Sequence, residues 1–200
     1  MASGHGRLIT IEGIDGAGKT TLADGILRAH PELTLLREPG GVAVSERIRD
    51  LVKDPALDVD PRTEALLYAA ARAQLVHERL LPLLAAGHDV LLDRFVDSSL
   101  AYQGAGRGLG VAEIAELNRF ATAGVTPDLT LYVRVDPRTG AARRDGADRL
   151  EQAGEAFFAA VVAAYDDIAA REPGRVVVLD GGRPPADVLA AALRALNALH

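Results

Sequence analysis

A glycine-rich segment near the N-terminus has the residue types and spacing of a phosphate-binding loop. It matches the pattern G-x-x-x-x-G-K-[ST] at every fixed position between Gly13 and Thr20. Glycines let backbone N–H groups point inward around phosphate oxygens, and the motif lysine reaches the β- and γ-phosphates. We therefore expect nucleotide binding by the loop and the residue after it: Gly13, Ile14, Asp15, Gly16, Ala17, Gly18, Lys19, Thr20 and Thr21.

A carboxylate later in the chain is a second candidate for binding Mg²⁺. Asp93 follows the apolar run Val90-Leu91-Leu92, so it ends an expected buried strand. A carboxylate at such a strand end can reach a metal bound to phosphates, or it can cap the next segment. Because a phosphate loop is present, we favour the metal role, with the Thr20 hydroxyl and Asp93 as ligands.

Three other segments could bind the group that accepts the phosphate. Arg37 to Gly41 reads Arg-Glu-Pro-Gly-Gly, a rigid turn with a charged rim. Tyr68 and Arg72 are four residues apart, so they share one face of an expected helix and could stack on a base and bind its edge. The loop after the 90–93 strand carries Arg94, hydroxyl groups and Tyr102. Surface packing of the Tyr–Arg pair and simple packing of the loop tyrosine are the alternative interpretations.

Short β-branched runs alternate with alanine- and leucine-rich stretches that have helical periodicity. This alternation predicts a doubly wound α/β fold with a parallel sheet, in which ligands bind beyond the carboxyl ends of the strands. We expect Pro82 to kink or divide a long helical stretch, and the charged segment 143–149 to form a flap. The expected strands are 8–12, 33–36, 90–93, 129–135 and 176–179, and the expected helices are 19–30, 42–52, 61–86, 111–123, 137–143, 153–171 and 184–199.

Composition excludes several classes of protein. The 200 residues suit one domain, residues 1–200, and the absence of cysteine excludes disulfide scaffolds, thiolate metal sites and cysteine nucleophiles. A net charge of −6 disfavours a general nucleic-acid surface. The short polar N-terminus and the lack of any apolar stretch of about 18 residues argue against a signal peptide and a membrane span. We expect a soluble, cytoplasmic protein with no nucleic-acid or membrane partner.

In this order along the chain, the segments resemble the thymidylate kinase family over about residues 8–180. The family elements are the phosphate loop opened by Glu-Gly-x-Asp-Gly, the Arg-Glu-Pro-Gly-Gly turn, the Tyr–Arg pair, and the segment Asp-Arg-Phe…Ser…Ala-Tyr-Gln-Gly. An Asp-Arg-x-Glu sequence and a Phe…Tyr helix follow. Here these elements are residues 12–16, 37–41, 68 and 72, 93–104, 148–151, 157 and 165.

The resemblance implies a P-loop kinase fold: a five-stranded parallel sheet with helices on both faces and a short mobile lid at about 143–151. It also implies a homodimer, for which the helices at 61–86 and 111–123 could supply the interface. The implied reaction is phosphorylation of dTMP to dTDP with ATP and Mg²⁺ in dTTP biosynthesis. The acceptor phosphate is itself the nucleophile, so catalysis requires positioning and charge neutralisation rather than a strong base.

By the same resemblance, individual residues acquire roles. Asp15 contacts the 3′-hydroxyl of dTMP, Tyr68 stacks on thymine, and Arg72 binds a base carbonyl. The complete implied acceptor site is Asp15, Arg37, Pro39, Tyr68, Arg72, Arg94, Ser99, Tyr102 and Gln103, with Arg94 on the phosphate, Ser99 near the base edge and Tyr102 crowding the ribose 2′ position. The implied catalytic residues are Lys19, Arg94, Asp15 and a lid arginine, Arg144 as first choice and Arg149 as second.

Two alternative functions share the phosphate loop but not the transfer of phosphate to dTMP. A P-loop kinase could act on another nucleoside monophosphate or on a deoxynucleoside, and a regulatory module could bind ATP and transfer nothing. The sequence departs from the family pattern at Val42, Phe95 and Ser99, outside the phosphate loop, which bears on affinity and selectivity rather than on reaction type. Resembling proteins also suggest a cis peptide before Pro39.

Overall fold

A computed structural model describes residues 5–143 and 154–199 of the chain. Most of the expected lid, including Arg144 and Arg149, therefore lies outside the described residues. The strands are β1 (Leu8–Glu12), β2 (Thr34–Arg37), β3 (Val90–Asp93), β4 (Leu129–Arg134) and β5 (Val176–Asp180). The helices are α1 (Lys19–Ala29), α2 (Ala43–Lys53), α3 (Pro61–Leu75), η1 (Val76–Leu80), α4 (Leu81–Ala85), α5 (Val96–Ser99), η2 (Leu100–Gly106), α6 (Val111–Ala121), α7 (Pro137–Ala142), α8 (Glu155–Arg171) and α9 (Pro185–Asn197).

The strands form one parallel sheet in the order β2-β3-β1-β4-β5, which confirms the predicted sheet and its strand count. β1 lies at the centre and pairs with β3 and β4 along its whole length, from Leu8↔Val90 to Glu12↔Tyr132. The order of the chain reverses on either side of β1, so the segments that follow β1 and β3 meet at the carboxyl edge. A ligand site is expected at such a switch point.

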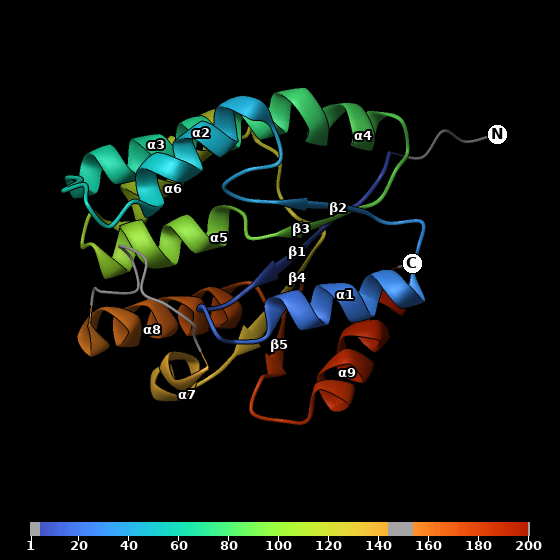
Figure 1. The fold of residues 1–200 in the computed structure, drawn as a ribbon. Helices are drawn as coiled ribbons and strands as arrows, with labels where there is room; N and C mark the ends of the chain where they lie inside the picture. Colours follow the sequence, from blue (N-terminus) through green and yellow to red (C-terminus); the bar gives the residue numbers. More distant parts are fainter. Residues whose placement is uncertain (1–4, 144–153, 200) are drawn as a thin grey trace.

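Helices cover both faces of the sheet (Figure 1). α1 and α9 lie side by side and pack on one face, while α3, η1 and α4 cover β2 and β3 on the other. α8 packs on β4 and β5. Within the part of the chain that the structure describes, no helix has the length and apolar character needed to cross a membrane.

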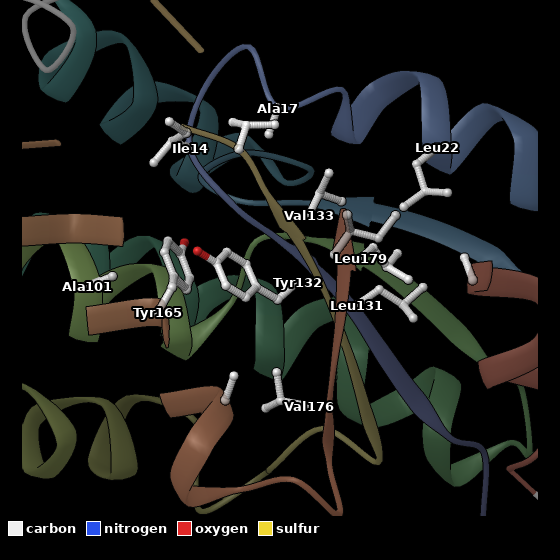
Figure 2. Close-up of a cluster of buried hydrophobic side chains, with 14 of the residues drawn as sticks. Ile14, Ala17, Leu22, Ala101, Leu131, Tyr132, Val133, Tyr165, Val176 and Leu179 are labelled. Atoms are coloured by element: carbon white, nitrogen blue, oxygen red, sulfur yellow. The ribbon is translucent and has the colours of Figure 1, made fainter. Parts of the chain in front are cut away.

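The larger of two buried apolar clusters surrounds β1 and β4 (Figure 2). Ile9, Ile11 and Leu131 are buried in it together with residues of α1 and α9. The rings of Tyr132 on β4 and Tyr165 on α8 face one another (Figure 2) and stack, with their centroids 5.0 Å apart. The smaller cluster lies between β3 and the η1–α4 segment.

The helical stretch before β3 is interrupted just ahead of Pro82. The α-helical hydrogen-bond pattern ends at Leu75, and the Leu81 N–H donates to the carbonyl of Val76, five residues earlier. Pro82 has no N–H to donate, and the wider turn re-pairs backbone groups next to it. The long helix is thus divided, although its axis continues as a π-helical turn.

One expectation about local structure is wrong. The segment after β3, which we expect to be a loop, folds as the helix α5 and the π-helix η2, so Tyr102 lies on a helix and is 5% exposed. The run contains small residues, glycines and a glutamine without helical apolar periodicity, so the sequence pattern does not predict a helix here. Burial between α6 and α8 stabilises it instead.

Candidate active site

The phosphate loop connects β1 to α1 with the geometry that its glycines predict. Gly13 and Gly16 have φ angles of 140° and 79°, which only glycine adopts readily. A Cβ at Gly16 would lie 2.2 Å from the carbonyl oxygen of Gly140 on α7, so the loop approaches that helix closely. Gly18 precedes the first turn of α1, and the positive end of that helix faces the loop.

Lys19 is buried inside the loop that it is expected to serve. Its Nζ donates to the Ile14 carbonyl at 3.0 Å and lies 3.5 Å from Asp15 Oδ1. Burial and the positive charge of Arg94 lower the pKa of Lys19 to about 8. The ammonium group is therefore still mostly protonated at neutral pH, and it has weak protein partners that a phosphate oxygen can replace.

The two expected metal ligands line the same cavity. Asp93 ends β3, and its Oδ1 is buried with no hydrogen-bond partner among the described residues. A buried carboxylate oxygen without a partner is costly unless an ion, a water or a ligand satisfies it. Thr20, on the first turn of α1, also lines this cavity. A hydroxyl and a carboxylate are hard oxygen ligands of the kind that Mg²⁺ prefers, so the donors present fit that ion.

Arg94 is held above the phosphate loop in an unusual backbone conformation. Its φ angle is 68°, a left-handed value that costs a non-glycine residue about 1–3 kcal/mol. Its Nη2 donates to Asp15 Oδ1 at 2.5 Å, and its guanidinium lies 5.2 Å from the centroid of the Tyr102 ring. Although burial opposes ionisation, the positive charges of Arg94 and Lys19 hold the pKa of Asp15 well below its usual range. Two cations and one carboxylate thus meet at the cavity wall beside the phosphate loop.

Arg72 is buried and bound almost entirely by protein groups. Its Nε donates to Glu38 Oε2 at 2.6 Å, and Nη2 donates to the Phe95 carbonyl at 2.8 Å. Nη1 donates to Ser99 Oγ at 2.8 Å and to Asn118 Oδ1. Four of the five guanidinium N–H groups are therefore occupied, and the fifth, on Nη2, has no partner among the residues that the structure describes. A base carbonyl could accept from that one group.

The remaining expected acceptor residues also border the cavity. The hydroxyl of Tyr102 is buried and has no hydrogen-bond partner in the described part of the chain. Gln103 is held by a hydrogen bond from its Nε2 to Glu64 Oε1 at 2.8 Å. Arg37 donates to Glu46 at 2.7 Å, and the Glu38–Pro39 peptide is cis, as resembling proteins suggest. The acceptor-site residues in the cavity wall are Asp15, Arg37, Pro39, Tyr68, Arg72, Arg94, Ser99, Tyr102 and Gln103.

One cavity of about 900 Å³ contains both the loop side and the acceptor side. This volume lies at the upper end of the range of about 300–1,000 Å³ that is usual for ligand sites. Although the whole chain has a net charge of −6, basic side chains dominate the cavity wall. They are Lys19, Arg37, Arg49, Lys53, Arg72, Arg94, Arg143 and Arg183.

Sequence reasoning missed several residues of this site. Arg49 and Lys53 lie four residues apart on α2 and line the cavity, and Arg49 Nη1 donates to the Pro39 carbonyl at 2.8 Å. Their i, i+4 spacing directly after the Arg37–Gly41 turn is a signal that could have found them. Arg143, at the edge of the expected lid, donates to the Gly181 carbonyl at 3.0 Å. Conversely, Gly13 and Ile14 at the start of the loop are buried and are not in the cavity wall.

Comparison with known proteins agrees with this geometry. A family model described as thymidylate kinase matches residues 11–192.

The chain belongs to the thymidylate kinase family.

Relatives named thymidylate kinase support this assignment. One from Lactobacillus delbrueckii subsp. bulgaricus is 46% identical over 201 residues, covering 95% of this chain and 95% of its own. Another, from Deinococcus radiodurans, is 48% identical over 187 residues, covering 90% and 91% of the two chains. The crystal structure of thymidylate kinase from Ehrlichia chaffeensis superposes with a TM-score of 0.78 at 31% identity, covering 96% of this chain and 99% of that one. The fold is therefore the P-loop kinase fold of thymidylate kinases.

Proposed function

We propose that the chain is an ATP-dependent dTMP kinase that produces dTDP for dTTP synthesis. The observation that carries this proposal is the single cavity in which a phosphate loop faces an aromatic and arginine-lined acceptor site. Lys19 and the loop N–H groups bind the ATP phosphates, and Arg94 binds the phosphate of dTMP. The relatives' shared name and their similarity over nearly the whole chain support dTMP as the acceptor.

The residues perform transfer by positioning and charge neutralisation. Arg94 and Lys19 both approach Oδ1 of Asp15, so their charges would bring the anionic acceptor and donor phosphates close together despite mutual repulsion. Thr20 and Asp93 would hold Mg²⁺, which would supply further neutralisation of the phosphate charge. We assign the transition-state cation to Arg144, with Arg149 as the second choice; both stand in the proposed lid at about 143–151.

A substrate panel tests the proposed function. ADP release from ATP and Mg²⁺ is measured with dTMP, dUMP, dCMP, dAMP, dGMP and thymidine, one at a time. We expect dTMP to give the highest kcat/KM. Preference for another monophosphate or for thymidine would retain the phosphate loop and reassign the acceptor site. ATP binding without turnover on any acceptor would make the chain a regulatory module.

Tyr102→Phe tests how the site distinguishes deoxyribose from ribose. The phenyl ring keeps the edge contacts with Phe157 and Phe158, so the variant loses only the buried hydroxyl that has no partner among the described residues. We expect the preference for dTMP over its ribonucleotide to fall roughly tenfold, because removing the hydroxyl opens space for a 2′-hydroxyl. Competition between the two monophosphates measures the ratio. An unchanged ratio in Tyr102→Phe and in Tyr102→Ala would remove this residue from the sugar site.

We also propose that the protein is a homodimer through α2, α3 and α6, which lie side by side (Figure 1). Large apolar side chains are exposed on these helices: Leu66 on α3 is 58% exposed and Phe120 on α6 is 87% exposed. Exposed apolar side chains that gather on one layer mark an interaction surface. We expect Phe120→Glu to shift the sedimentation coefficient from dimer to monomer at micromolar concentration. A wild-type chain that sediments as a monomer would contradict the proposal.

A further inference from the structure

A buried carboxylate beneath the phosphate loop has no place in the function described so far. Glu12 ends the central strand β1, and its side chain is completely buried. Its Oε1 accepts from the Phe95 N–H at 2.7 Å, and its Oε2 accepts from Ser98 Oγ at 2.6 Å and from Tyr165 Oη at 2.9 Å. Neither Glu12 nor Tyr165 is in the cavity wall, so neither is in position to contact a bound nucleotide.

These contacts hold Arg94 from two sides. The backbone is held because Phe95, the residue after Arg94, donates its N–H to the Glu12 carboxylate. On its side-chain side, Arg94 Nη1 donates at 3.1 Å to Ser98 Oγ, the same hydroxyl oxygen that donates its proton to Glu12. Because Glu12 takes the hydroxyl proton, a lone pair of Ser98 is directed to the guanidinium.

Arg94 needs such support for a physical reason. Its φ angle of 68° is unfavourable for an arginine, so the surroundings must impose it. A long side chain also loses rotamer freedom when it is fixed on one position. Among the described residues, Arg94 also donates its N–H to the Ile11 carbonyl at 3.0 Å, pairs with Asp15, and packs its guanidinium against the Tyr102 ring. Asp15 is itself expected to contact the acceptor, so the support that is independent of substrate comes from Glu12, which lies outside the cavity wall and acts through Ser98 in that wall.

The position of Glu12 is an unfavourable one for a carboxylate. Burial and the negative charge of Asp97 raise the pKa of Glu12 to about 7, so the protein spends free energy to keep this carboxylate where it is. A buried charge with this cost is a poor stabiliser, and an apolar side chain would serve packing better.

We infer that Glu12 and Ser98 are positioning residues, which hold Arg94 in the orientation that binds the acceptor phosphate. This inference rests on the proposed function. It assigns no contact with substrate to Glu12, and it places the effect of both residues on the acceptor side of the reaction. The ATP side is held separately, by the loop N–H groups and Lys19.

Ser98→Ala is the main test, because it removes the hydroxyl and leaves the guanidinium, the carboxylate and the ion pair with Asp15 in place. A misplacement of about 1 Å at a reacting group can cost about a hundredfold in rate. We therefore expect kcat/KM for dTMP to fall tenfold to a hundredfold, while KM for ATP changes less than about twofold. Ser98→Thr retains the hydroxyl and should recover most of the loss.

Glu12→Gln tests the carboxylate with almost no change of shape. The amide oxygen can still accept from Phe95, but the amide nitrogen donates to Ser98 and turns the hydroxyl proton away from its present partner. We expect a loss in kcat/KM for dTMP similar in direction to that of Ser98→Ala. The double variant should lose little more than Ser98→Ala alone, because both changes break the same support.

Thr10→Val is the matched control for loss of a buried hydroxyl. Thr10 lies two residues before Glu12 on the same face of β1, is completely buried, and its hydroxyl bonds Thr130 at 2.8 Å rather than Arg94. We expect it to lower the melting temperature as Ser98→Ala does, with kcat/KM unchanged. All variants are assayed at least about 15 °C below their own melting temperatures so that the folded population is compared.

The outcomes separate the inference from the function on which it rests. Wild-type-like kcat/KM in Ser98→Ala, or an equal loss in Thr10→Val, overturns the positioning role while dTMP turnover by the wild type keeps the proposed function. A loss that falls on KM for ATP instead of dTMP also overturns it. If the wild-type chain does not phosphorylate dTMP, the proposed function fails on its own.

Discussion

Replacement of Lys19 by alanine is expected to lower kcat by a hundredfold to a thousandfold or more. Lys19 lies inside the phosphate loop with its Nζ on the Ile14 carbonyl, so it is placed to meet the β- and γ-phosphates of ATP. Removing one preorganised donor that stabilises transition-state charge typically costs about 10²–10³ in kcat. Initial rates of ADP formation at saturating ATP and dTMP measure the effect.

The fold should survive this change. Among the described residues, the side chain of Lys19 bonds only the Ile14 carbonyl and approaches Asp15 at 3.5 Å, and its charge is repelled by that of Arg94. We therefore expect a melting temperature within a few degrees of the wild type. Arg28→Ala is the matched control, because it removes an exposed cation from the last turn of the same helix, outside the cavity. Near-normal turnover in Lys19→Ala, or a similar loss in Arg28→Ala, would contradict the assignment of the phosphate loop.

Replacement of Arg72 by alanine is expected to destabilise the protein by about 3–5 kcal/mol, the usual effect of breaking a buried ion pair. The side chains of Arg72 and Glu38 are 2% and 3% exposed, and burial already raises the pKa of Glu38 despite the arginine beside it. Without Arg72 the carboxylate is left uncompensated, and Asn118 and the Phe95 carbonyl also lose a donor. Urea unfolding followed by circular dichroism measures the difference in free energy of unfolding.

A second substitution shows whether the buried charge causes the loss. Glu38→Gln in the Arg72→Ala background removes that charge, so the double variant should be more stable than Arg72→Ala alone. Arg119→Ala is the surface control, since its ion pair with Glu116 is 69% and 70% exposed and should leave stability unchanged. If Arg72→Ala unfolds at the same urea concentration as the wild type, the hydrogen-bond network around Arg72 contributes nothing to the fold.

Folded Arg72→Ala should also show a raised KM for dTMP, because the one remaining N–H on Nη2 is lost.

The Lys19 prediction tests a residue placed by a local loop, and the Arg72 prediction tests a residue held by contacts between distant segments. Lys19 acts through a loop whose geometry is local, and it contributes little to stability. Arg72 joins groups from the turn after β2, from α5 and from α6, so its loss affects the fold and the acceptor site together. Measuring both kcat and the free energy of unfolding in the two variants distinguishes a loss of catalysis from a loss of stability.

The sequence by itself determined the phosphate loop and the order of the strands and helices. Both depend on residues that are close together in the chain: the loop is eight consecutive positions, and apolar runs report burial directly. The residues that the family resemblance implies for the acceptor site all border one cavity. The predicted helix at 61–86 also agrees with the structure except for the π-turn before Pro82.

Only the tertiary structure decided which buried groups hold the side chains of the site in place. The partners of Glu12 lie 83, 86 and 153 positions away in the chain, and the Arg72 partners lie up to 46 positions away. A buried polar pair leaves no periodic pattern, because its free energy comes from hydrogen bonds between distant segments rather than from local propensity. For the same reason the helix at 96–106 was missed: its glycines and small residues are poor helix formers, and packing between α6 and α8 compensates for that weakness.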